Sequence, residues 1–129
     1  MAKTQTTASF SGGVEGAVFS GNASSTPTNG VGTTYVAGTT PVLDGGLSLV
    51  NGQTGQTAVA LPTIWPLTAP LIVVNTGAAT ALVFPGAATH QINGAAAGTS
   101  YSVAAQKAVT FYYVGLSSAG VPQWAAVGA

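Results

Sequence analysis

The chain has 129 residues and a mass of 12.5 kDa, which is about the size of one domain. Charged residues make up 3% of it, against about 25% in an ordinary soluble domain, and the formal net charge is zero. This composition argues against nucleic-acid binding, because phosphate contacts require several basic side chains and the chain has only Lys3 and Lys107. It argues equally against binding to a charged membrane surface.

The scarcity of charge also bears on the protein's surface. A compact monomer of this mass exposes roughly 6,000 Å², so two basic and two acidic residues leave about one charge per 1,500 Å². Free domains stay soluble through interspersed charges, and a net charge of zero promotes association. We therefore expect other protein to cover much of this surface in the working state.

Residues 1–45 are predicted to form an extended N-terminal arm. This region is rich in Gly, Ser, Thr and Asn, and the run SGNASSTPTNGVGTT has almost nothing to bury. Such an arm could become ordered by adding strands to a neighbouring molecule. Its apolar residues are isolated from one another: Phe10, Val14, Val18, Phe19, Tyr35 and Val36.

Residues 46–129 are predicted to form an all-β domain, a small β-sandwich or a jelly-roll-like fold. Good helix formers are scarce, and short β-rich runs are bounded by Gly, Pro or Asn. The predicted strands are Leu47–Val50, Leu71–Val74, Ala81–Phe84 and Val109–Val114, with a final strand around Trp124. The predicted turns are Asn29-Gly30, Asp44-Gly45, Asn51-Gly52 and Asn93-Gly94, because Asn, Asp and Gly tolerate positive φ.

The sequence predicts neither a membrane-spanning helix nor a secretory signal. The most apolar window, LPTIWPLTAPLIVV at residues 61–74, has only 14 residues and three prolines, so it does not predict a membrane-spanning helix. The N-terminus MAKTQTTASF lacks the apolar segment of a secretory signal. We expect a soluble, unprocessed intracellular product.

The segment YSVAAQKAVTFYYV, residues 101–114, is predicted to be a hairpin with its turn at residues 105–107. Strict alternation would place one set of side chains on the core face and a second set on the other face. The core set is Tyr101, Val103, Val109, Phe111 and Tyr113, and the opposite set is Ser102, Thr110 and Tyr112.

No catalytic, metal-binding or cofactor-binding residues are predicted. Glu15 and Asp44 are the only acids, His90 is the only histidine, and there is no cysteine. No serine lies in a G-x-S-x-G motif, so the sequence does not predict a nucleophilic triad. One His, one Asp and one Glu are too few ligands for a dedicated metal site. We expect that the protein is not an enzyme.

Four aromatic residues leave an alternative open. Trp65, Tyr112, Trp124 and Tyr35 could serve as stacking platforms for a sugar, or they could be core or subunit-interface anchors. The two interpretations differ in where the tryptophans lie. Burial of Trp65 and Trp124 favours packing, whereas an exposed groove beside His90 and Asn93 favours binding.

Residues 70–115 carry the pattern VVN-G-A…L-V-P…INGAAA…S-V-A-A-x-K-A-x-T-F. This segment, about a third of the chain, resembles small Gly/Ala-rich bacteriophage virion proteins of the head decoration (cement), head-fibre or tail-fibre type. The resemblance implies Lys107 at a hairpin turn, where Gln106 stands in place of the more usual Gly. It does not extend over the first 45 residues.

The resemblance implies a structural protein on the capsid surface of the virion. A cement protein binds the major capsid protein and stabilises the head by burying apolar and backbone surface between capsid subunits, and such proteins often stand as homotrimers. No cofactor, nucleic acid or membrane is implied. The alternative is a tail-fibre or receptor- or glycan-binding virion module.

Overall fold

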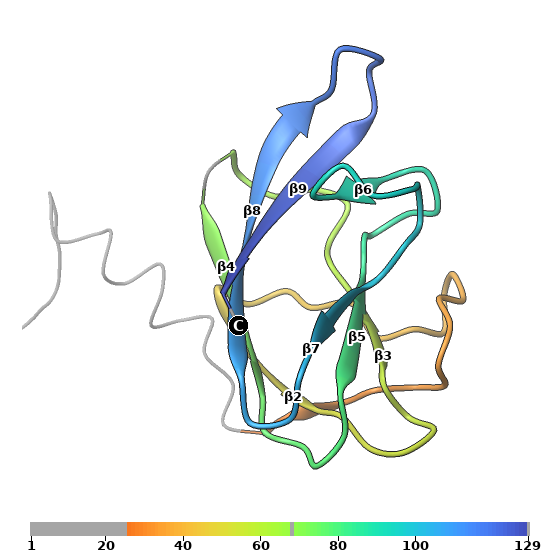
Figure 1. The fold of residues 1–129 in the computed structure, drawn as a ribbon, viewed down its shortest axis with the longest axis vertical. Helices are drawn as coiled ribbons and strands as arrows, with labels where there is room; N and C mark the ends of the chain where they lie inside the picture. Colours follow the sequence, from red (N-terminus) through yellow and green to blue (C-terminus); the bar gives the residue numbers. More distant parts are fainter. Residues whose placement is uncertain (1–25, 68, 129) are drawn as a thin grey trace, which may run out of the picture.

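The computed structural model describes residues 26–67 and 69–128, and in these ranges it contains β-strands and no helix. The all-β fold class is therefore confirmed. The strands form two sheets, a larger one in the order β1-β2-β4-β8-β9-β6 and a smaller one in the order β3-β5-β7 (Figure 1). The strands are β1 (Thr28–Asn29), β2 (Leu47–Asn51), β3 (Ala58–Ala60), β4 (Pro70–Asn75), β5 (Ala81–Phe84), β6 (Gln91–Ile92), β7 (Tyr101–Val103), β8 (Ala108–Leu116) and β9 (Pro122–Gly128).

A single hydrophobic core joins the two sheets. In β4, alternate residues are buried, which is the pattern of a strand with one face on a core. Tyr101 of the smaller sheet meets Phe111 of the larger sheet edge to face, with ring centroids 5.7 Å apart. The buried core consists of Leu43, Val50, Val59, Leu61, Leu71, Val73, Ala81, Val83, Ile92, Val103, Val109, Phe111 and Trp124.

The larger sheet is mixed in direction. β2 runs parallel to both of its neighbours, β1 and β4, whereas β8 runs antiparallel to β4 and β9. The β8–β9 pair extends beyond the rest of the molecule in Figure 1. A register shift between Tyr113 and Gly115, with Gly115 at φ 92°, bends this ribbon.

The four predicted strands and the final strand around Trp124 are present, but the predicted hairpin over residues 101–114 is wrong. β7 pairs with β5 in the smaller sheet, and β8 pairs with β4 and β9 in the larger sheet. The turn itself lies where predicted, with the Lys107 N–H donating to the Ala104 carbonyl. The chain therefore passes from one sheet to the other at this turn.

Gln106 adopts the backbone conformation that glycine usually supplies at such a turn. Its φ is 61°, in the left-handed region that is strained for most residues. Its side-chain amide donates to the carbonyls of Thr76, at 2.8 Å, and Gly77, at 3.1 Å. These two bonds to the loop after β4 offset the strain and anchor the turn.

Residues 26–45, which belong to the predicted arm, lie against the strands that follow them in the chain. Leu43 belongs to the core, and β1 pairs with β2. Residues 31–43 follow the edge of β3, where Val31 donates to the Ala58 carbonyl and Leu43 to the Ala60 carbonyl. A Gly- and Thr-rich segment with little to bury is held here by backbone hydrogen bonds. The arm's residues 1–25 lie outside the described residues.

Only one of the four predicted turn dipeptides uses positive φ. Asn93 and Gly94 have φ of 52° and 70°, as a type I′ turn requires, and the Ala95 N–H closes the turn on the Ile92 carbonyl. Gly52 serves a different purpose: a Cβ there would lie 2.5 Å from the Ala79 carbonyl oxygen. Glycine is needed at that position for close approach of two loops.

Candidate functional site

The titratable side chains of the described residues do not form a reactive cluster. Asp44 is exposed in the loop before β2, and Lys107 is exposed in the turn before β8. No group of three or more His, Cys, Asp or Glu side chains that could hold a metal ion occurs in the part of the chain that the structure describes. Lys3 and Glu15 lie outside that part.

His90 is half-buried just before β6. Its Nδ1 atom is buried and has no hydrogen-bond partner, and desolvation by burial lowers the pKa of the imidazole from its ordinary value of 6.5. Burial of an unpaired nitrogen favours the neutral ring. This environment favours a packing role for His90, because burial makes protonation of the ring less favourable.

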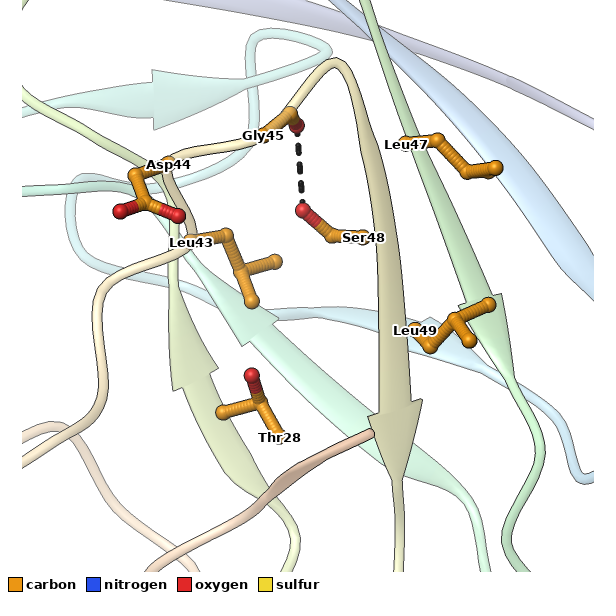
Figure 2. Close-up of a pocket in the computed structure, with 7 residues that line it drawn as sticks. All are labelled: Thr28, Leu43, Asp44, Gly45, Leu47, Ser48 and Leu49. Atoms are coloured by element: carbon orange, nitrogen blue, oxygen red, sulfur yellow. Dashed lines mark hydrogen bonds between the residues drawn. The ribbon is translucent and has the colours of Figure 1, made fainter. Parts of the chain in front are cut away.

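A small pocket lies beside the N-terminal half of β2 (Figure 2). Its volume is about 30 Å³, which is about the space of one water molecule and far below the roughly 300–1,000 Å³ of a typical ligand site. The Ser48 hydroxyl, which lies on this side, donates to the Gly45 carbonyl at 3.1 Å. The lining residues are Thr28, Leu43, Asp44, Gly45, Leu47, Ser48 and Leu49.

The aromatic residues that could have stacked on a sugar are mostly engaged in packing. Trp124 is 2% exposed in the core, and Trp65 packs against that core with its Nε1 donating to the Ala69 carbonyl at 3.0 Å. The Tyr35 hydroxyl donates to the Gly86 carbonyl at 3.1 Å.

Asn93, the polar residue considered for a groove beside the tryptophans, is bonded to β9. Its Oδ1 accepts from the Ala126 N–H, and its Nδ2 donates to the Ala126 carbonyl. Together with the burial of Trp124 and the packing of Trp65, this favours the packing interpretation over the sugar-binding one.

The outward side of the larger sheet carries apolar side chains that are exposed or half-buried. In β2, Ser48 and Val50 are buried while Leu47 and Leu49 face outward, and Figure 2 shows Leu47 and Leu49 on the side of the strand opposite Ser48. β4 and β8 alternate in the same way. The pairing registers align the outward residues into cross-strand rows.

Three such rows cross the sheet. In the central row, Leu47 of β2 pairs with Ile72 of β4. Ile72 pairs in turn with Thr110 of β8, and Thr110 pairs with Val127 of β9. The row on one side of it is Pro70, Tyr112 and Ala125, and the row on the other side is Leu49, Val74 and Ala108. We call these ten residues the outer apolar face: Leu47, Leu49, Pro70, Ile72, Val74, Ala108, Thr110, Tyr112, Ala125 and Val127.

The outer apolar face contains no charged residue. Thr110 and Tyr112 supply its only side-chain hydroxyls, and Val127 is 61% exposed. Four strands about 4.8 Å apart and about six residues long give it an area of roughly 400 Å². Leu47, Ala108 and Val127 are exposed, and the other seven residues of the face are half-buried. An apolar patch of about this size is as large as the largest patch on a typical monomer, which often has a function.

The outer apolar face was not identified from the sequence as a site, although the expectation of a covered surface points to it. The signal is the run Leu71–Val74, LIVV, in which apolar residues occupy both faces of one strand. Such a run is typical of a strand that is covered on both sides. Comparisons with family models, with curated proteins and with solved structures found no match to this chain.

Proposed function

We propose that this protein is a structural component of a bacteriophage virion, a decoration or cement protein that binds the major capsid protein and stabilises the head as a homotrimer. The observation that carries the proposal is the outer apolar face, a registered apolar sheet surface without a charged residue. A surface of this kind is suited to burial against protein. The resemblance of residues 70–115 to virion proteins is the reason to place this contact on a virion.

The small volume of the pocket beside β2 and the packing of the tryptophans favour a role based on contact. The pocket beside β2 holds about 30 Å³, and the two tryptophans pack against the core. A cement protein acts by adding buried surface between neighbouring subunits, which requires no reactive group. Apolar burial contributes about 25 cal/mol per Å² before the costs of association.

Salt dependence tests the type of contact. The whole chain offers only two basic and two acidic side chains to a partner, so few counterions are released on binding. We expect occupancy on purified heads to change little between low salt and about 1 M NaCl, where the Debye length is about 3 Å. Lys3→Ala and Lys107→Ala should bind almost normally. Release of most of the protein by moderate salt would contradict a contact based on apolar burial.

The alternative, a tail-fibre or receptor- or glycan-binding module, differs in its place on the particle. Heads and tails separated from purified virions and analysed by mass spectrometry would distinguish the two proposals. Recovery with the heads supports decoration. Recovery only with the tails supports the alternative, and recovery with neither contradicts both.

A further inference from the structure

We propose that Asn93 is a site of spontaneous covalent modification, at which the side-chain amide is converted to a carboxylate through a succinimide. Glycine follows the asparagine in each Asn-Gly pair, so no side chain hinders the backbone nitrogen that would react. The structure distinguishes the pairs by the space around that glycine. The pairs among the described residues are Asn29-Gly30, Asn51-Gly52 and Asn93-Gly94.

The reaction balances with water as its only co-reactant. The Gly94 backbone nitrogen attacks Cγ of Asn93 and forms a C–N bond, and its proton leaves with the side-chain NH₂ group as ammonia. Water then opens the five-membered succinimide ring at either of the two ring carbonyls. Opening at one carbonyl gives aspartate, and opening at the other gives isoaspartate, in which the backbone passes through the former side chain.

Asn93-Gly94 has the space that ring closure requires. Both residues are exposed in the turn after β6, and a Cβ placed on Gly94 would meet no heavy atom within 4 Å. In the part of the chain that the structure describes, the Gly94 N–H has no hydrogen-bond partner. The reaction therefore has to break only the two exposed bonds between the Asn93 amide and Ala126.

Asn51-Gly52 lacks this space. Gly52 is buried, and a Cβ on it would lie 2.5 Å from the Ala79 carbonyl oxygen. The Gly52 N–H donates to Oδ1 of Asn75 at 3.1 Å, in a buried position. Attack on the Asn51 side chain would require the nitrogen to leave this bond, so we expect packing to protect Asn51.

Asn29-Gly30 is protected in the same way. Gly30 is buried, and a Cβ on it would lie 2.6 Å from the Gln56 carbonyl oxygen. The Gly30 N–H donates to the Asn51 carbonyl at 3.5 Å, and Oδ1 of Asn29 accepts from the Asn51 side chain. Ring closure would move backbone that is packed against the segment before β3, so we expect Asn29 to react slowly as well.

The modification changes both the charge and the contacts of the turn after β6. It adds one negative charge to a chain whose formal net charge is zero. Nδ2 of Asn93 donates to the Ala126 carbonyl at 3.3 Å, and a carboxylate oxygen in its place would face that carbonyl with no proton to donate. We therefore expect the contact of β6 with β9 to be weaker in the modified protein.

Peptide mapping by mass spectrometry tests the assignment in the purified full-length chain after incubation in warm, mildly alkaline buffer. Chymotrypsin cleaves after aromatic residues and leucine, so the three pairs fall in different peptides. We expect aspartate and isoaspartate to form at least roughly tenfold faster at Asn93 than at Asn29 or Asn51, because exposed segments open more easily than buried ones. In denaturant the three rates should become similar. Equal rates in the folded protein, or a slower rate at Asn93, would overturn the proposal.

Two matched substitutions provide a second readout. Asn93→Gln and Asn51→Gln each introduce the longer amide, which closes the corresponding six-membered ring far more slowly. Ion-exchange chromatography of the incubated proteins resolves the species that carry the added charge. We expect Asn93→Gln to remove most of the acidic species and Asn51→Gln to leave their amount unchanged. Equal amounts in the two variants would contradict the assignment to Asn93.

Asn93→Asp tests the effect on the contact with β9, because it carries the charge of the product from the start. Its thermal midpoint should lie below that of the wild type at neutral pH. An unchanged midpoint would overturn the expected weakening of this contact.

Discussion

Replacement of Asn75 by alanine should be among the most destabilising single substitutions in this chain. Asn75 ends β4, and its side chain is completely buried between the two sheets. The four hydrogen bonds of its amide connect loops after β2 and β4 to the smaller sheet. Its Oδ1 accepts from the N–H groups of Gly52, at 3.1 Å, and Gly77, at 2.9 Å; its Nδ2 donates to the carbonyls of Ala79, at 2.8 Å, and Val103, at 3.0 Å.

The magnitude follows from the partners that alanine would leave behind. An asparagine amide can make four hydrogen bonds in this way, and all four are made here. Gly52, Gly77 and Val103 are themselves buried, so water cannot readily replace the lost partner. Each buried polar group left unsatisfied costs about 1–3 kcal/mol, which gives roughly 3–9 kcal/mol for these three partners. That is a large part of the 5–15 kcal/mol that stabilises a typical domain.

Denaturant unfolding followed by circular dichroism measures this loss, and the thermal midpoint should fall by at least about 10 °C. Asn51→Ala is the matched control, because the Asn51 amide makes one exposed bond to Asn29 and should cost less than about 1 kcal/mol. Asn75→Asp keeps the shape but replaces both donors, so it should also destabilise the protein at neutral pH. Equal stability of Asn75→Ala and Asn51→Ala would refute the reasoning.

Two further predictions concern pH and close packing. Because burial lowers the pKa of His90 below 6.5, the folded state binds its proton less readily than the unfolded state, so stability should decline as pH falls from about 6.5 toward the folded pKa. Melting curves should show this decline in the wild type, and an unchanged decline in His90→Gln would contradict it. Gly77→Ala would drive a Cβ into the backbone of Gly52 and should cost more than about 3 kcal/mol. Gly32→Ala meets open space and should cost only about 1–2 kcal/mol for its positive φ, so equal losses for the two glycines would be contrary to expectation.

The positions of the main strands could be predicted because their residues alternate and are bounded by turn-forming residues. The pairing of β7 with β5 could not be predicted in the same way. Alternation identifies which side chains face a core, and Val103 and Val109 do face the same core. It carries no information on which strand supplies the hydrogen-bond partner. Two strands joined by a short turn can therefore lie in opposite sheets and still match the pattern of a hairpin.

The packing of residues 26–45 was underestimated for a related reason. Composition measures the apolar surface that a segment can bury, and this segment has little apart from Leu43. Its backbone groups are held instead by partners such as Ala58 and Ala60 of β3, which are distant in the sequence. Hydrogen bonds of this kind depend on tertiary contacts and leave no local pattern.

The sequence predicts that protein covers part of the surface, but it does not predict which face of the fold is covered. The near absence of charge indicates a surface that is covered by protein, whereas the outer apolar face depends on the register of four strands. Thr110 and Val127, for example, belong to the same row only because β8 and β9 pair in the observed register. A shift by one residue would move the apolar set to the opposite side of the sheet.

An electron cryomicroscopy map of intact virions tests the central claim most directly. The account predicts trimers of the two-sheet fold on the outside of the head, in contact with the major capsid protein, with the outer apolar faces covered by protein. Density for this fold only in the tail, or its absence from the particle, would contradict the account.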